Sequence, residues 1–185
     1  MEFQNTDEFL SKVKRIIISE NQIKSAVKKA GEMINSSYQG TPILLVSILK
    51  GSFIFLSDLC REVKVPCEVG FMAAKSYYED THSSGEVKIT MDLQQDISKY
   101  NVIIVEDIID TGRTLSDIVN LLKSRNPISL KVITLLDKPD RRTVDFEADY
   151  SLFTIPDIFV IGYGLDYGEY FRNLPCIAEF SEWNL

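Results

Sequence analysis

The stretch that most constrains this chain is residues 102–115, VIIVEDIIDTGRTL. It opens with four apolar, mostly β-branched residues, which is typical of a buried strand. Three carboxylates follow, Glu106, Asp107 and Asp110, and after them comes the small turn TGRT at 111–114. Apolar residues then recur at helical spacing, at Leu115, Ile118, Val119, Leu121 and Leu122. The segment therefore predicts a strand that enters a helix through a polar turn.

The two halves of this turn suit different parts of one ligand. A helix start offers unpaired N–H groups and the positive end of a dipole, and both attract a phosphate. Gly112 lets the backbone approach a ligand closely, while two threonines and an arginine add hydroxyl donors and positive charge. Glu106 and Asp107 would repel a bare phosphate, but they suit the hydroxyls of a sugar, bound directly or through a metal. The turn therefore predicts a ribose-5-phosphate site, and the alternative is an ordinary strand-to-helix turn with solvated acids.

Polar residues follow other predicted strands as well. Strands are predicted over 43–49, 130–136 and 158–161, and directly after them come Lys50-Gly51, Asp137-Lys138 and Gly162-Tyr163-Gly164. In open α/β sheets ligands bind at the carboxyl ends of the strands, so parallel strands would bring these residues to one edge. The alternation of strands and helices favours such an α/β fold. For each lysine, the alternative is an exposed side chain in a simple βα turn.

Three other segments have a predicted shape. Val13 and Ile16 to Ile18 indicate a short strand or a packed arm. Ser19 and Gln22 form a capping box, and apolar residues at helical spacing then predict a helix that ends near Ser37. Residues 75–86, KSYYEDTHSSGE, form a long polar loop that is either surface or a lid over a site.

Composition excludes several classes of protein. With 185 residues the chain predicts one domain, and no apolar run approaches the roughly 20 residues that a membrane span needs. The net charge of −7 argues against a broad nucleic-acid surface, although it permits a small basic pocket. A single histidine, His82, excludes multi-histidine zinc sites. The cysteines, with no CxxC pair, indicate free thiols in a reducing cytoplasm: Cys60, Cys67 and Cys176.

Several separated motifs, in order, resemble one family. EDIIDTGRTL resembles the phosphoribosyl-pyrophosphate (PRPP) motif of the type I phosphoribosyltransferases. Leu49-Lys50-Gly51 upstream and FVIGYGLDYGEYFRNLP at 159–175 resemble the branch of that family that acts on hypoxanthine and guanine. The similarity runs from about Ile43 to Pro175, which is most of the chain.

The resemblance implies a fold and a reaction. The fold would be an α/β domain over residues 1–185 with a central, mostly parallel sheet flanked by helices, a flexible lid hairpin, and a small hood from the N-terminal segment and about 155–185. The reaction would transfer the 5-phosphoribosyl group from PRPP to N9 of hypoxanthine or guanine, giving IMP or GMP and pyrophosphate with Mg²⁺ as cofactor. A cytoplasmic homodimer or homotetramer in purine salvage is implied, with no nucleic-acid or membrane partner.

The resemblance also implies roles for single residues. Asp110 would be catalytic and handle the proton at purine N7. The residues implied for PRPP are Lys50, Gly51, Glu106, Asp107, Asp110, Thr111, Gly112, Arg113, Thr114 and Arg172. For the base, Lys138 would bond the 6-oxo group and Phe159 would stack, and the base site as a whole would contain Lys138, Phe159, Val160 and Asp166. Metal ligands would be Glu106, Asp107 and Asp166, and the lid would carry Ser76 and Tyr77.

An RNA-binding regulator on the same fold is the alternative from another class. Such a regulator would need a basic face, and the net charge of −7 counts against one. The matches at Lys138 and Phe159 also count against it. A pyrimidine or adenine transferase would share the PRPP motif but would lack this C-terminal pattern.

Overall fold

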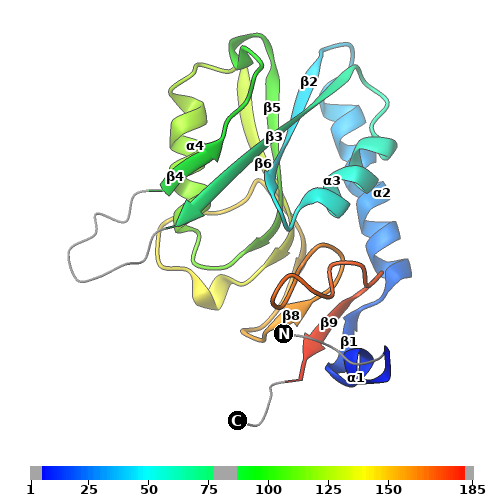
Figure 1. Cartoon of the computed structure of the whole chain (residues 1–185). Helices are drawn as coiled ribbons and strands as arrows, with labels where there is room; N and C mark the ends of the chain where they lie inside the picture. Colours follow the sequence, from blue (N-terminus) through cyan, green and yellow to red (C-terminus); the bar gives the residue numbers. More distant parts are fainter. Residues whose placement is uncertain (1–5, 77–86, 182–185) are drawn as a thin grey trace, which may run out of the picture.

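The computed structural model describes residues 6–76 and 87–181. Along these residues the elements are α1 (Thr6–Ser11), β1 (Val13–Ile18), α2 (Glu20–Ser37), β2 (Ile43–Leu49), α3 (Phe53–Glu62), β3 (Cys67–Ser76), β4 (Val87–Met91), η1 (Ile97–Lys99), β5 (Asn101–Ile109), α4 (Arg113–Lys123), β6 (Ser129–Asp137), η2 (Pro139–Arg141), β7 (Tyr150–Thr154), β8 (Val160–Ile161) and β9 (Ile177–Phe180). The described strands form a six-stranded sheet in the order β4-β3-β2-β5-β6-β7 and a three-stranded sheet in the order β1-β9-β8 (Figure 1).

The large sheet is parallel from β3 to β7, and the edge strand β4 runs antiparallel to β3. Six of the seven residues of β2 are buried, as a strand covered on both faces requires. On one face Leu45 of β2 packs in a core with α2 and α3, and on the other Leu44 packs in a core with α4. The predicted α/β fold with a central, mostly parallel sheet flanked by helices is confirmed.

Most of the predicted elements are confirmed. The strand over 43–49 is β2, the strand over 130–136 lies within β6, and 13–18 forms β1. Helix α2 ends at Ser37 and begins with the predicted capping box, in which Gln22 N donates to Ser19 Oγ. Strand β7 and strand β9 were not predicted.

The strand expected over 158–161, in the segment expected to form the hood, lies outside the large parallel sheet. Only Val160–Ile161 is a strand, and it pairs antiparallel with β9 in the small sheet. The chain leaves the large sheet after β7, where Pro156 has no N–H for a ladder and Ile158 N donates to Pro156 O at 2.8 Å. The loop after β8 therefore reaches the ligand edge from a different sheet.

The small sheet joins the two ends of the described chain. β1 pairs antiparallel with β9, so Val13 lies opposite Phe180. The rings of Phe9 and Phe171 stack with centroids 4.2 Å apart beside this sheet. Within residues 6–76 and 87–181, no helix has the length and apolar character that crossing a bilayer requires.

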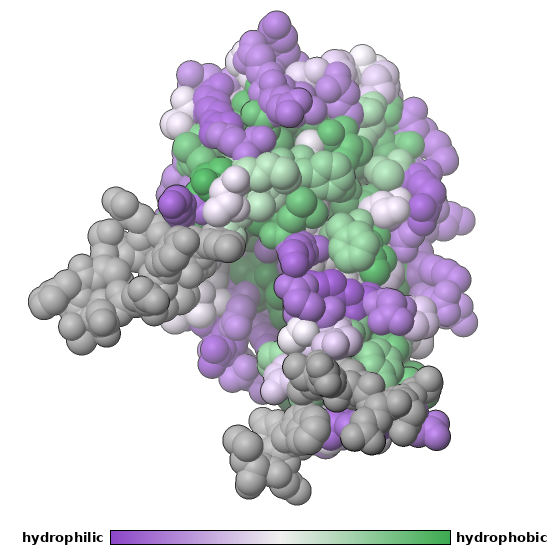
Figure 2. Space-filling model, viewed as in Figure 1, coloured by the Kyte–Doolittle hydropathy of each residue, from purple (hydrophilic) through white to green (hydrophobic). Residues whose placement is uncertain are grey.

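One apolar area stays exposed on the front of the large sheet. Figure 2 shows apolar surface over β3, and Val69 and Phe71 lie there on the same face of that strand. Together with Met91 of β4 they line a hollow of about 460 Å³.

Candidate active site

The carboxyl ends of β2 and β5 surround a cavity of about 300 Å³. The lining comes from two stretches of chain plus Ala74, namely Ile48, Leu49, Lys50, Gly51, Glu106, Asp107, Ile108, Ile109, Asp110, Thr111, Gly112, Thr114 and Leu115. The predicted phosphate turn and the Lys50-Gly51 loop are therefore brought together. The parallel pairing of β2 with β5 is the cause, because it ends both strands at the same edge.

The phosphate turn opens α4 as predicted. Gly112 is the N-cap residue with φ 81°, in the left-handed region that glycine adopts without strain. A Cβ atom there would lie 2.9 Å from Arg142 Cδ, so the turn is also packed from outside. The N-terminus of α4 faces the cavity through Thr111, Gly112 and Thr114, which puts the positive end of a helix dipole at the site.

The two carboxylates at the end of β5 are half-buried and belong to consecutive residues. Burial raises the pKa of Glu106 well above its usual range, and the neighbouring Asp107 raises it further. Burial also raises the pKa of Asp107 to about 6, although Ile108 N donates to its Oδ1 at 2.9 Å. Among the described residues, Glu106 Oε2 is buried without a hydrogen-bond partner.

These oxygens fit a hard cation that completes its shell with substrate atoms. Mg²⁺ commonly takes one or two protein carboxylates together with substrate phosphates and waters. The orphaned Glu106 Oε2 and the raised pKa values of both acids are what such a cation, or a pair of sugar hydroxyls, would relieve. Within the described part of the chain, no three acids, histidines or cysteines cluster as a complete metal site.

Two glycines let the loops close over the acids. A Cβ atom on Gly51 would lie 1.5 Å from Asp107 Oδ2, and one on Gly164 would lie 2.0 Å from Gly51 O. Three segments that are distant in sequence thus meet, with the backbone of Gly51 between the Asp107 side chain and the backbone of Gly164. The peptide bond between Leu49 and Lys50 is cis. The sequence placed Gly162-Tyr163-Gly164 and Lys50-Gly51 at one edge, but the direct contact of Gly164 with Gly51 depends on the position of the small sheet.

Arg172 faces this edge from the loop after β8. Its Nη1 donates to Gly164 O at 2.8 Å, and its Nη2 lies 2.9 Å from Asp166 Oδ1. Its Nε is buried without a partner among the described residues. Asp166 is therefore engaged with Arg172 and does not line the cavity with Glu106 and Asp107.

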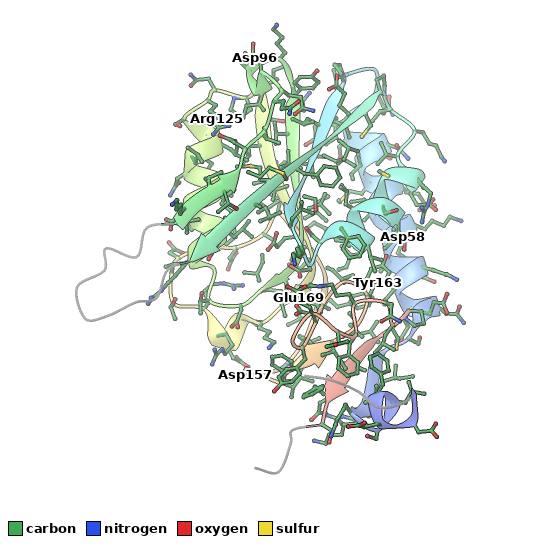
Figure 3. The ribbon with its side chains drawn as sticks, in the orientation of Figure 1. Asp58, Asp96, Arg125, Asp157, Tyr163 and Glu169 are labelled. Carbon is green, nitrogen blue, oxygen red and sulfur yellow. The ribbon has the colours of Figure 1, made fainter. Side chains whose placement is uncertain are left out.

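Lys50 is tied to the same loop. Its Nζ lies 2.9 Å from Glu169 Oε1, and Glu169 Oε2 also lies 3.0 Å from Arg172 Nη2. Figure 3 shows Glu169 between the ligand edge of the large sheet and the small sheet. Sequence reasoning predicted no role for Glu169. Hydrogen bonds from the two cations lower the pKa of Glu169, and its carboxylate neutralises part of their charge.

The residues expected at the base lie at the end of β6 and beside β8. Lys138 is only 7% exposed, so the alternative of a solvated surface lysine is wrong. Its backbone N donates to Ile109 O at 3.0 Å, and its Nζ lies 3.9 Å from Asp157 Oδ1. Phe159 is 49% exposed and makes edge contacts with Tyr167 and Phe180 at 5.8 Å. Val160 is buried within β8.

The predicted lid lies mostly outside the described residues. Tyr77 and most of the 75–86 loop lie outside the described residues, and of Ser76 only the backbone is described, at the end of β3. Arg113 is exposed, and its Nε donates to Thr143 Oγ1 at 2.9 Å.

Comparison with known proteins gives a consistent family. A model described as the phosphoribosyl transferase domain matches residues 15–168. The hypoxanthine phosphoribosyltransferase of Buchnera aphidicola is 47% identical over 167 residues, covering 89% of this chain and 94% of that protein. The hypoxanthine-guanine phosphoribosyltransferase of Streptococcus pneumoniae is 46% identical over 170 residues, covering 92% of this chain and 94% of that protein.

A solved structure agrees with these relatives. The hypoxanthine phosphoribosyltransferase of Staphylococcus aureus superposes with a TM-score of 0.91 at 44% identity, and the match covers 97% of each chain. The RNA-binding alternative receives no support from these comparisons. With the PRPP motif lining a cavity at the carboxyl end of a parallel sheet, the chain belongs to the phosphoribosyltransferase family.

Proposed function

We propose that this protein transfers the 5-phosphoribosyl group from PRPP to N9 of hypoxanthine or guanine, releasing pyrophosphate and giving IMP or GMP for purine salvage. The observation that carries the proposal is the cavity where the phosphate turn, the acid pair and the Lys50-Gly51 loop meet. Relatives named for hypoxanthine and guanine, at 46–47% identity, support the choice of base.

PRPP would lie along the cavity with its phosphate at α4. The N–H groups of residues 111–114 bind the 5′-phosphate, since a helix start offers such donors without competition from the helix itself. Glu106 and Asp107 accept bonds from the ribose hydroxyls. The pyrophosphate is held by the Lys50-Gly51 loop and by Arg172, whose buried Nε has no partner among the residues that the structure describes.

Mg²⁺ fits this arrangement through Glu106 and Asp107, which would hold it together with substrate oxygens. Its chemistry there is to neutralise the charge of the leaving pyrophosphate. Asp166 is a further metal-associated acid in our proposal, and its bond to Arg172 keeps it close to the leaving group.

The purine would lie between Phe159 and the end of β6. The ammonium of Lys138 has donors only, so it complements the 6-oxo acceptor of hypoxanthine and opposes the 6-amino donor of adenine. Phe159 stacks on the ring, and the backbone of Val160 faces the 2-position. Asp110 takes the proton at N7 as N9 bonds to the sugar.

The remaining features of the proposal concern the whole protein. Closure of a lid that carries Ser76 and Tyr77 would exclude water and limit hydrolysis of PRPP. The chain folds as one domain, with the small sheet as its hood, and acts in the cytoplasm. It assembles as a homodimer or homotetramer, and the exposed Val69, Phe71 and Met91 provide apolar surface of the kind that oligomers bury.

Two measurements test this function. Assays with radiolabelled hypoxanthine, guanine and adenine, PRPP and magnesium should give nucleotide from the first two bases and scarcely any from adenine. Crystals soaked with IMP should have phosphate oxygens within hydrogen-bond reach of the 111–114 N–H groups. Phosphate bound elsewhere with this turn empty, or turnover of adenine alone, would contradict the proposal.

A further inference from the structure

Two consecutive arginines contact Asp110, one at its side-chain carboxylate and the other at its backbone carbonyl. Arg141 Nε donates to Asp110 Oδ1 at 3.0 Å, and Arg142 Nη1 donates to the Asp110 carbonyl at 2.5 Å. Both arginines come from the η2 turn and the residue after it, on the exit of β6. Arg142 is anchored by an ion pair with Asp137. The conformation of Asp110 therefore depends on a segment about 30 residues further along the chain.

Arg141 has a second acidic partner. Its Nη1 lies 3.6 Å from Asp157 Oδ2, and the other oxygen of Asp157 lies 3.9 Å from Lys138 Nζ. Figure 3 shows Asp157 beside the η2 turn. Asp110, Arg141, Asp157 and Lys138 thus form a row of alternating charges, which we call the charge row. It joins the acid proposed for the N7 proton to the lysine proposed for the 6-oxo group.

The charge row leaves one carboxylate oxygen of Asp110, Oδ2, available to bind substrate. Among the described residues, Oδ1 is bonded to Arg141, and no hydrogen bond is made to Oδ2. A carboxylate on a turn rotates freely unless one oxygen is held, and here Arg141 holds it. The Arg141 guanidinium stays protonated during the transfer step, because an arginine side chain does not lose its proton in proteins. It therefore only donates hydrogen bonds to Asp110 and takes up no proton itself.

We infer that Arg141 is a positioning residue, which orients Asp110 so that Oδ2 meets the proton on purine N7. This inference rests on the proposed function and on the role proposed there for Asp110. In that step the N9–C1′ bond forms while the C1′–O bond breaks, with its electron pair leaving on pyrophosphate. The N7 proton passes to Oδ2, and Arg141 keeps its bond to Oδ1.

A positioning role makes a different prediction from a structural one. Arg141 and Asp110 are 47% and 44% exposed, so their ion pair contributes little to stability. Misplacement of a catalytic group can nevertheless cost up to about 100-fold in rate. Arg141→Ala should therefore lower kcat about 10-fold to 100-fold, with KM for PRPP changed less than about twofold. The thermal midpoint should stay within about 2 °C.

Matched variants test whether the effect on kcat depends on the charge of the Arg141 side chain, on its length or on its location. Arg141→Lys keeps a donor and a charge and should recover part of the lost kcat, whereas Arg141→Gln keeps a donor without charge and should recover less. Arg125→Ala is the control, since Arg125 makes a bidentate pair with Asp92 at 2.7 and 2.8 Å. Figure 3 shows Arg125 at the opposite end of the molecule from Asp157, so this variant should keep kcat within about twofold.

A double-mutant cycle decides whether Arg141 acts through Asp110. In an Asp110→Asn background, Arg141→Ala should cause no further loss of kcat beyond about twofold, because residues that act as a unit are not additive. Losses that multiply, or a wild-type kcat in both Arg141→Ala and Arg141→Gln, would overturn the inference alone. A wild-type protein that makes no IMP from hypoxanthine and PRPP would overturn the proposed function and the inference with it.

Discussion

The phosphate side and the base side of this cavity are built in different ways. The phosphate side is one continuous stretch, residues 102–115, in which a strand, a turn and a helix follow directly. The base side combines the end of β6, the η2 turn and the loop around β8, which belongs to another sheet. The first depends on local rules of strand and helix termini, and the second depends on how two sheets meet.

This difference predicts where substitutions act. Changes on the phosphate side alter one compact turn, and changes on the base side also alter a row of charges that links three segments. Asp110 lies in the sequence of the phosphate side, but its side chain contacts the base side. Substituting it therefore tests the comparison most directly.

Asp110→Asn should have the largest effect. A general acid–base group contributes about 10²–10⁴-fold, so kcat for IMP formation should fall by that order. PRPP binding should persist, because the 111–114 turn and the acid pair are unchanged. Steady-state kinetics and PRPP titration check this. A wild-type kcat in the variant would remove Asp110 from the chemistry, and loss of PRPP affinity would assign it to the phosphate side alone.

Lys138→Gln should have the next largest effect, on the choice of base. A buried site built around a charged donor rejects a mismatched partner, because one group is left unpaired. Gln removes the charge and adds an acceptor, so the ratio of kcat/KM for hypoxanthine to that for adenine should fall at least about 10-fold. KM for PRPP should change little.

Lys131→Gln is the matched control for Lys138. It makes the same substitution within β6, the strand that Lys138 directly follows, but Lys131 is exposed and paired with Asp149 at 2.6 Å. The control should keep the wild-type ratio of hypoxanthine to adenine. If Lys138→Gln keeps that ratio as well, Lys138 does not select the 6-oxo group.

The same contrast explains what could be predicted from the sequence. The apolar run before Glu106 and the glycine at the helix start identify the phosphate turn, because each local signal agrees with the others. Lys138 was predicted from a resemblance, and its burial depends on packing that no local pattern encodes. Arg141, Asp157 and Glu169 were not assigned roles, since paired charges between distant segments have no periodic signal.

The loop after β8 is the clearest limit of sequence reasoning. Parallel strands were the condition under which residues 162–164 would reach the ligand edge, yet β8 pairs antiparallel with β9 in the small sheet. The contact of Gly164 with Gly51 still brings this loop to the ligand edge. The neighbours of this loop were therefore expected, but the route by which it reaches them depends on the pairing of distant strands.

Asp107→Asn should stabilise the protein at neutral pH, in magnesium-free buffer. The folded pKa of about 6 exceeds the ordinary aspartate pKa of 3.8, so the folded state binds the proton more tightly. Below pH 3.8 Asp107 is protonated in both the folded and the unfolded state, so its ionisation does not affect the free energy of unfolding. As pH rises towards 6 the wild type loses stability, and above 6 the loss is complete at about 1–3 kcal/mol.

Urea unfolding from pH 4 to 8 measures this difference. The advantage of Asp107→Asn over wild type should be absent near pH 4 and fully present by pH 7, while IMP formation is lost. Asp145→Asn, at an exposed position, is the control and should follow the wild-type curve. An advantage that does not vary with pH would show that the buried charge of Asp107 is not the cause.

The smallest expected effect concerns the bond that ties the base-side loop to α3. Tyr163 is buried with φ 49°, and its hydroxyl donates to Asp58 Oδ2 at 2.6 Å (Figure 3). Burial raises the pKa of the Tyr163 hydroxyl, so it remains a donor at all working pH values. Tyr163→Phe removes this bond and should lower the free energy of unfolding by about 1–2 kcal/mol. Tyr100→Phe is the matched control, because the half-buried Tyr100 donates to Glu68 Oε1 at the same 2.6 Å in a hydrogen bond that is exposed to solvent. The control should cost less than about 0.5 kcal/mol, since water replaces an exposed partner.

If the base side depends on the position of the loop after β8, Tyr163→Phe should also raise KM for hypoxanthine more than KM for PRPP. Equal changes in both KM values would mean that the bond stabilises the fold without orienting the base side, and the two sides would then be less independent than their construction implies.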